Sequence, residues 1–315
     1  MPSRTDNPMS AVRKKKATVA PTKKKGTSSS ACKSPRAPQK AKAKQAYFMP
    51  VWQRNLLAVV ITLCFSFAFY YFCIRPYSYR WKPCHGVKGY GVCIPSGYNI
   101  HGIDISHYQG KIDWERLQQN RQTTIPLHFV FMKATEGGDH NDTTFEANFA
   151  NARTHGFIRG AYHFYNPATD ALKQADFFIR TVKLDTGDLP PVLDVEVTGK
   201  KEKPELQRGL KQWLDRVESH YGVKPILYTS YKFKTRYLDD TLFNAYPYWI
   251  AHYYVDSVKY RGKWHFWQHT DVGSVPGIEE DVDLNVFNGT LEELKSLTLK
   301  PLAFQSSPAK PSPAK

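Results

Sequence analysis

Acidic side chains are nearly absent from the first 54 residues, which contain 14 of the 44 Lys/Arg but only one of the 28 Asp/Glu, Asp6. This segment has a net charge of +13, whereas the rest of the chain carries 30 basic and 27 acidic side chains, a net of +3. The formal charge of +16 therefore belongs to one tail. It gives no reason to expect a specific nucleic-acid partner for the rest of the chain.

Apolar residues are also scarce at both ends of the chain. Residues 1–54 are rich in Lys, Ala, Ser, Pro and Thr, and residues 299–315 are a Ser/Pro/Ala/Lys segment. Segments of this composition bury too little apolar surface to offset the entropy of folding. The sequence therefore predicts disordered tails over 1–54 and 299–315.

Charge is missing altogether from residues 55–74, twenty residues that as a helix would span roughly 30 Å of hydrocarbon. Trp52 before the segment and Tyr70 and Tyr71 within it suit the aromatic belts of a membrane interface. A cleaved signal peptide fits less well, because a long basic region precedes the segment and no small-x-small site follows it. We expect a single membrane-spanning helix, with the basic N-terminus in the cytoplasm and the residues after it outside.

Cysteine is scarce, with five residues in the chain. Cys84 and Cys93 lie beyond the apolar segment, in a Gly-rich stretch of the linker 75–99, where an oxidising compartment favours a disulfide over two free thiols. Metal-ligand spacing, a phosphate-binding Gly loop and a Ser-His-Asp order are all missing. We therefore expect no metal and no cofactor.

Residues 100–298 alternate short apolar runs with amphipathic stretches, which predicts a βα repeat around a parallel sheet. About eight strands in this length favour a closed, TIM-like (β/α) barrel, made irregular by the short connections between its later strands. The predicted strands are Ile100–Ser106, His128–Thr135, Ile158–Phe164, Val192–Val197, Pro225–Thr229, Tyr248–Ala251, Trp264–Gln268 and Val282–Val286. The predicted helices are Asp113–Asn120, Thr144–His155, Ala168–Val182, Pro204–Tyr221 and Leu291–Leu297.

Two carboxylates, Asp194 and Glu196, lie one residue apart in the fourth predicted strand. Residues i and i+2 of a strand share a face, and burying two unpaired acids is costly. Two solvent-facing acids on an edge strand are the alternative. Other polar side chains also lie near strand ends, where barrels place reactive groups: Asp104, Lys133, Tyr162, Tyr228, Gln268 and Asp283. A barrel would bring them together, which favours a functional site.

These segments resemble glycoside hydrolase family 25, the muramidases that cleave peptidoglycan between N-acetylmuramic acid and N-acetylglucosamine. The matching stretches occur in family order over roughly residues 100–290: Gly102 to Gly110, Phe131 to Gly137, Gly160 to Phe164, Leu193 to Glu196, Ile226 to Ser230, Tyr248 to Ala251, Trp267 with Gln268, and Val282 to Asn285. The resemblance implies an irregular β/α barrel and a peptidoglycan substrate. It also implies that Glu196 is the general acid/base and that Asp194, Asp104 and Asp283 complete an acidic floor.

Several carboxylates in one pocket raise the proton affinity of at least one of them, as cleavage of a glycosidic bond requires. Tyr162, Tyr228 and Trp249 are candidates to stack on sugar rings, although strand aromatics often belong to the core. Gln268 and Lys133 are candidates for hydrogen bonds to substrate. The spacing leaves both an inverting route and a retaining, substrate-assisted route open, and we favour the latter. An inactive, peptidoglycan-binding scaffold protein is the alternative function, and the sequence does not indicate an oligomeric state.

Overall fold

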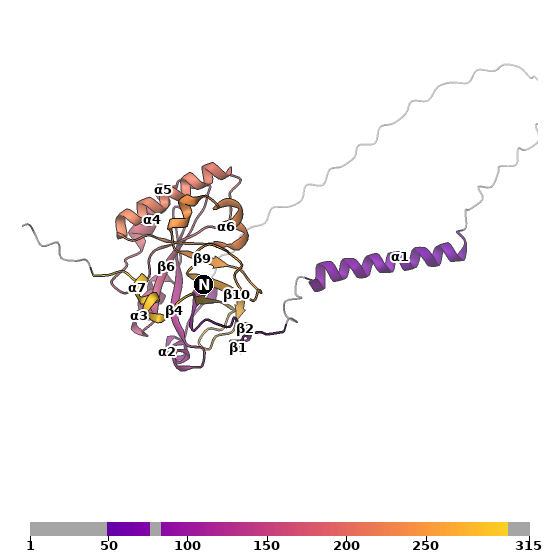
Figure 1. Ribbon diagram of the computed structural model, residues 1–315, viewed down its shortest axis with the longest axis horizontal. Coiled ribbons are helices and arrows are strands. Elements are labelled where there is room, and N and C mark those ends of the chain that lie inside the picture. Colours follow the sequence, from indigo (N-terminus) through magenta and orange to yellow (C-terminus); the bar gives the residue numbers. More distant parts are fainter. Residues whose placement is uncertain (1–48, 76–82, 302–315) are drawn as a thin grey trace, which may run out of the picture. The chain divides into compact units, whose positions relative to one another are not determined.

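The computed structural model describes residues 49–75 and 83–301 (Figure 1). The predicted tails fall almost wholly outside these residues, as do residues 76–82. The described residues form an N-terminal helix and a barrel, and each is treated separately below.

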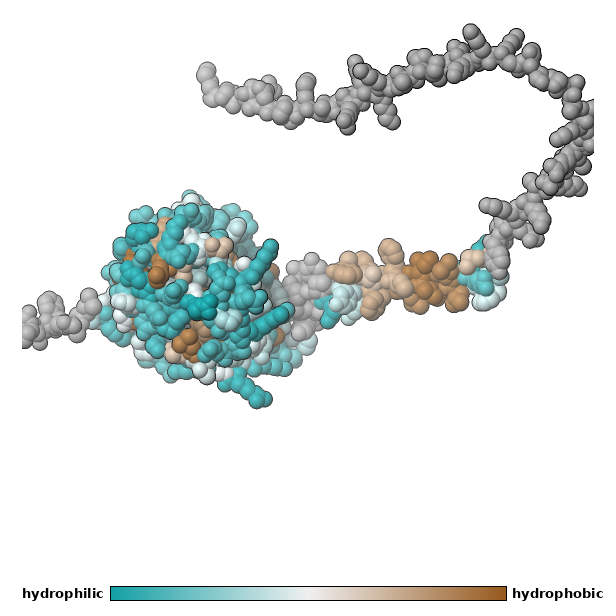
Figure 2. Space-filling model, turned by 90° about the horizontal axis from the view of Figure 1, so that it is seen from above, coloured by the Kyte–Doolittle hydropathy of each residue, from teal (hydrophilic) through white to brown (hydrophobic). Residues whose placement is uncertain are grey.

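The N-terminal helix α1 (Val51–Phe69) continues as a π-helical turn, Tyr70–Ile74. Pro50 precedes its first turn, and the proline carbonyl accepts the N–H groups of Gln53 and Arg54, so the helix begins four residues before the predicted segment. The face of this helix that is seen in Figure 2 is mostly apolar. The span Val51–Ile74 contains an 18-residue window with a mean hydropathy of 2.3 and no buried residue, and it is long and apolar enough to cross a membrane.

A disulfide between Cys84 and Cys93 closes a small hairpin in the predicted linker. Its antiparallel strands are β1 (Val87–Gly89) and β2 (Val92–Ile94). Tyr90 and the glycine after it have φ values of 51° and 75°, the positive angles that a two-residue type I′ loop requires. The linker thus contains the expected disulfide, which closes an ordered two-stranded hairpin.

The hairpin is bonded to the barrel through its turn. The Tyr90 hydroxyl donates to the carbonyl of Ile125 at 2.7 Å, and the Tyr90 carbonyl accepts the N–H of Ser274 at 2.8 Å. One residue therefore joins the hairpin to two loops that are far apart in the sequence.

Eight strands close the predicted irregular barrel, in the order β3-β11-β10-β9-β8-β7-β6-β4 with β4 pairing back to β3 (Figure 1). A two-residue strand, β5 (His140–Asn141), pairs with the end of β4. The barrel strands are β3 (Ile100–Ile105), β4 (Leu127–Glu136), β6 (Ile158–Phe164), β7 (Val192–Asp194), β8 (Ile226–Ser230), β9 (Tyr248–Ala251), β10 (Phe266–Gly273) and β11 (Val282–Phe287).

The expectation of a parallel sheet is wrong for β11, which runs antiparallel to both β10 and β3. The connection from β10 to β11 contains no helix, and a short connection between neighbouring strands imposes the antiparallel direction. The other neighbouring pairs of barrel strands are parallel.

The helices that accompany these strands are α2 (Trp114–Gln119), α3 (Phe145–Thr154), α4 (Ala171–Thr181), α5 (Lys203–Tyr221), α6 (Tyr231–Tyr237) and α7 (Leu291–Leu297). Short 3-10 turns cover His107–Gln109, Asn120–Gln122 and Thr241–Ala245. Helix α5 begins with Pro204 in its first turn, ends at Gly222 in the left-handed region, and buries one apolar stripe. Helix α6 was not predicted.

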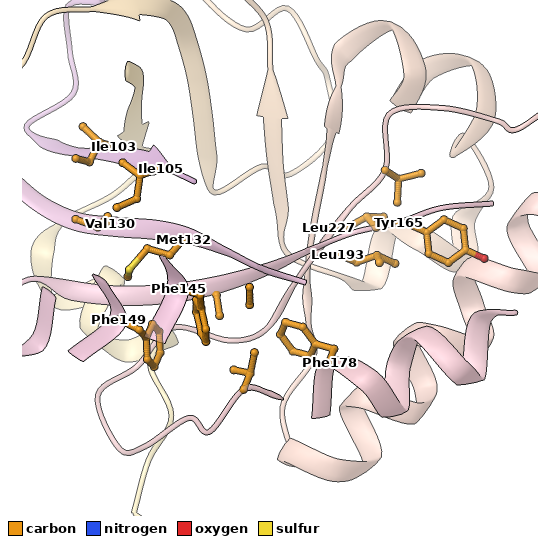
Figure 3. Close-up of a cluster of buried hydrophobic side chains, with 14 of the residues drawn as sticks. Ile103, Ile105, Val130, Met132, Phe145, Phe149, Tyr165, Phe178, Leu193 and Leu227 are labelled. Carbon is orange, nitrogen blue, oxygen red and sulfur yellow. The ribbon is translucent and has the colours of Figure 1, made fainter. Parts of the chain in front are cut away.

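Two apolar layers hold the barrel together. The outer layer packs strands against helices, with Ile105 and Met132 on the strands and Phe145 and Phe149 on α3 (Figure 3).

The inner layer is aromatic. The Phe131 ring stacks on Trp249 at 4.4 Å between centroids and contacts Phe266 edge-on at 5.1 Å. A Cβ on Gly102 would lie 2.5 Å from the Phe129 ring, so a glycine makes room for this layer. The inner aromatic layer fills the barrel below the polar site and gives that site a rigid base.

Candidate active site

Asp104 and Asp283 are direct partners on β3 and β11. Asp104 lies near the end of its strand and Asp283 near the start of its own. Because β11 is antiparallel, the start of this strand lies at the same edge of the barrel as the ends of the parallel strands. The structure therefore brings these two predicted site residues together.

Asp104 is held by two side-chain amides. Its Oδ2 accepts hydrogen bonds from Gln268 Nε2 at 2.9 Å and from Asn285 Nδ2 at 2.7 Å. The Asn285 Oδ1 accepts the indole N–H of Trp249 at 2.8 Å. The side chains of Asp104 and these three partners are all buried, so the hydrogen bonds fix the orientation of the Asp104 carboxylate.

Two tyrosines fix the orientation of the Gln268 side-chain amide. The hydroxyls of Tyr228 and Tyr253 both donate to Gln268 Oε1, each at 2.7 Å. With its oxygen occupied, the Gln268 amide must present its N–H₂ group to Asp104. Gln268, a candidate for substrate binding, therefore contacts the acid directly.

The paired acids differ from ordinary surface carboxylates in their proton affinity. Burial raises the pKa of Asp104 to about 6, against the opposing effect of the Asn285 and Gln268 hydrogen bonds. Burial and the neighbouring charge of Asp104 raise the pKa of Asp283 to about 9. The two groups titrate together, and the pair retains a proton at neutral pH.

The predicted strand Val192–Val197 is too long, because β7 ends at Asp194. Beyond this point the N–H of Val195 bonds to the carbonyl of Tyr228 outside the strand ladder. Asp194 is 6% exposed, whereas Glu196 is exposed. The two acids thus differ in exposure, with Asp194 in the barrel wall and Glu196 beyond the end of the strand, and the charge of Glu196 still acts on Asp194.

Both of these acids hold protons more tightly than usual. Burial, followed by the negative charges of Glu196 and Asp104, raises the pKa of Asp194. Its Oδ1 is buried and bonds to none of the described residues. Burial also raises the pKa of Glu196, whereas the Tyr228 hydroxyl and the charge of Lys133 act in the opposite direction.

Lys133 and Tyr162 belong to the same site. Lys133 is buried on β4, and its ammonium lies 2.6 Å from the carboxylate of Glu136 and 5.0 Å from the ring of Phe164. Burial raises the pKa of Tyr162 well above its usual value, and the charges of Asp104 and Asp194 raise it further. The Tyr162 hydroxyl therefore lies near the acids.

Trp249 and Tyr228, two of the aromatic candidates, are core residues in the structure. Trp249 is 2% exposed, with its ring against Phe131 and its N–H bonded to Asn285. Tyr228 is 6% exposed. Trp249 presents no free ring face on which a sugar could stack, whereas Tyr228 also lines the cavity beside Glu196. Both support the amides that hold Asp104.

Asn285 and Tyr253 were not predicted as site residues. Asn285 lies two residues after Asp283 on a strand, so the shared strand face was a usable signal. Tyr253 follows β9 in an irregular segment, where no local pattern indicates its contact with Gln268.

A cavity of about 500 Å³ opens beside Glu196. The β8 and β9 ends supply the rest of its wall, including Ser230, Tyr231, Lys232, His252 and Tyr253. Among residues 49–75 and 83–301, no group of three or more His, Cys, Asp or Glu side chains could hold a metal ion. The arrangement offers an exposed carboxyl of raised pKa, a space for substrate next to it, and further acids below.

A barrel with carboxylates gathered at the C-terminal edge of its parallel strands is the architecture of many glycoside hydrolases. The family model described as glycosyl hydrolases family 25 matches residues 103–278, more than half of the chain. The chain belongs to this family and is a glycoside hydrolase.

Relatives and solved structures agree with this assignment. An uncharacterized protein of Escherichia coli K12, YegX, is 46% identical over 219 residues, which cover 69% of this chain and 79% of the relative. Lysozyme M1 of Streptomyces globisporus is 32% identical over 63% of this chain and 71% of its own length. The Streptomyces coelicolor lysozyme structure has a TM-score of 0.60 at 32% identity and covers 64% of this chain and 98% of that protein.

Proposed function

We propose that this protein is a muramidase that hydrolyses the β-1,4 bond between N-acetylmuramic acid and N-acetylglucosamine in peptidoglycan. The observation that carries the proposal is the position of Glu196, exposed at the cavity and adjacent to a buried acid cluster. The names of two relatives support it: lysozyme M1, and the N,O-diacetylmuramidase of Arthroderma benhamiae at 29% identity.

In this proposal Glu196 is the general acid and then the general base. Its raised pKa favours the protonated form that donates to the glycosidic oxygen as the bond breaks. The resulting carboxylate then takes a proton from the water that completes hydrolysis. Its exposure to the cavity allows contact with both substrate and water.

Asp194 positions the substrate acetamide. Its buried Oδ1 has no partner among the described residues and can accept the acetamide N–H. The acetamide carbonyl oxygen would then attack the anomeric carbon as the leaving oxygen takes the proton of Glu196. Water opens the resulting cyclic intermediate and gives a product of retained configuration. The Asp104–Asp283 pair, which shares one proton, stabilises the positive charge that develops on the sugar.

Digestion of peptidoglycan by the full chain and by Glu196→Gln tests the activity. We expect the wild type to release muropeptides with muramic acid at the reducing end, identified by mass spectrometry. Loss of the general acid should lower the rate roughly 10²–10⁴-fold while glycan binding persists. A wild type that binds glycan but releases no reducing ends would instead support the scaffold alternative. The anomer formed first, followed by NMR, distinguishes retention from inversion.

We also propose that α1 anchors the enzyme in a membrane, with the N-terminus in the cytoplasm and the barrel outside. The apolar span, the basic residues before it and the Cys84–Cys93 disulfide support this placement. The full chain should resist a carbonate wash and dissolve in detergent. Release by carbonate alone would contradict the anchor. A C-terminal phosphatase reporter that is active only in an oxidising compartment tests the orientation.

A further inference from the structure

We propose that the cavity beside Glu196 binds the carboxylate-bearing substituent of the muramyl unit and that Lys232 is the cationic contact for that carboxylate. The inference rests on the proposed muramidase function. It goes further by naming the chemical group that this wall of the site recognises and the residue that recognises it.

The strand order places a lysine on each side of Glu196. On one side, beyond β6, Lys133 of β4 is buried and paired with Glu136 at 2.6 Å. On the other side, Lys232 follows β8, is exposed, and lines the same cavity as Glu196. Lys232 forms no ion pair with any residue in the described parts of the chain. Of the two cations, Lys232 is therefore the one available to an anionic ligand.

The neighbouring wall of the cavity is aromatic. The rings of Tyr231 and His252 are stacked, with centroids 4.7 Å apart and planes within 4° of parallel. The Nδ1 atom of His252 is buried and has no hydrogen-bond partner among the described residues. Burial and the charge of Lys259 lower the pKa of His252, so the ring is neutral near pH 7. The positive charge in the cavity lining therefore belongs to Lys232.

The chemistry of the substrate requires such a contact. N-acetylmuramic acid differs from N-acetylglucosamine by a 3-O-lactyl group, whose carboxylate is free or is linked to a peptide with carboxylates of its own. A floor of acids repels any anion that approaches it, and like charges in contact disfavour a binding mode. A substrate carboxylate is accommodated only when it points away from the floor and toward a cation. Lys232 on the cavity wall meets this requirement.

Three forms of one glycan test the inference: peptide-bearing strands, strands stripped of peptide by an amidase so that the lactyl carboxylate is free, and strands with their carboxyl groups capped as methyl amides. We expect Lys232→Ala to lower kcat/KM about fivefold on a carboxylate-bearing form, the size of effect typical of an exposed ion pair. It should leave the capped form unchanged, and Lys232→Arg should restore the rate. Lys263→Ala is the matched control, because Lys263 is exposed but precedes β10 at the opposite edge of the barrel.

The outcomes separate the possibilities. Loss on the peptide-bearing form assigns the contact to peptide carboxylates, and loss on the stripped form assigns it to the lactyl group. Equal loss on all three forms, or no loss on any, overturns the role of Lys232 and leaves the muramidase proposal intact. A wild type that cleaves none of the three overturns the proposed function itself.

Discussion

Replacing Asp283 by asparagine should flatten the decline of stability at alkaline pH. An aspartate in the unfolded chain loses its proton near its ordinary value of 3.8, whereas burial and Asp104 raise the folded-state pKa of Asp283 to about 9. Between these values the folded protein holds the extra proton, so unfolding releases it and stability falls as pH rises. The slope is about 1.4 kcal/mol per pH unit for one group. From about pH 7 to about pH 9 the wild type should thus lose about 2 kcal/mol through this residue, after allowance for its partial exposure.

An asparagine at position 283 does not titrate and can still donate to Asp104, so this part of the slope should vanish in the variant. Urea midpoints of the detergent-solubilised full chain, followed by tryptophan fluorescence across this pH range, measure the slope. Asp281→Asn, an exposed position two residues earlier, is the control and should behave as the wild type. Equal slopes in wild type and Asp283→Asn would refute a proton shared between the buried acids.

Three further variants test the scaffold. Cys84→Ser with Cys93→Ser should destabilise the hairpin by about 2.5 kcal/mol, as expected for a disulfide that closes so short a loop, and amide hydrogen exchange should localise the loss there. Arg159→Met should cost roughly 1.5–3 kcal/mol in urea unfolding, because it removes the buried guanidinium that bonds Asp188 at 2.8 Å and leaves this carboxylate to the half-exposed Arg153; unchanged stability would show that Arg153 alone compensates the charge. Gly102→Ala should lower the free energy of unfolding by about 1–3 kcal/mol, and with it the melting temperature, because the new Cβ would lie 2.5 Å from the Phe129 ring.

The barrel could be predicted because local sequence patterns indicate its strands and helices. The predicted ranges Ile158–Phe164 and Tyr248–Ala251 are also the observed bounds of β6 and β9, and α5 begins within one residue of its predicted start. Apolar runs and helical periodicity report which face of an element is buried. These patterns do not report which strands pair, so the antiparallel direction of β11 was missed.

The site was predicted by residue type better than by geometry. The pairing of Asp104 with Asp283 follows from barrel closure. The different exposure of Asp194 and Glu196 does not, because it depends on where the strand ends within the folded barrel. The amides that hold Asp104 come from residues 164 and 181 positions away in the chain. A local stretch of sequence cannot reveal such a network. The hydrogen-bond partners of a buried polar group can be identified only when its neighbours in the folded structure are known.

The pairing of β3 with β11 has a consequence for the timing of activity. The first strand of the barrel closes against the last, so the acid floor joins the two ends of the domain. A chain still being synthesised or exported has Asp104 from the beginning but lacks its partner Asp283 until almost the whole domain has emerged. Contacts of such long range also form late in folding. A glycoside hydrolase built in this way becomes active only late, because its acid site is complete only when nearly the whole domain has been made.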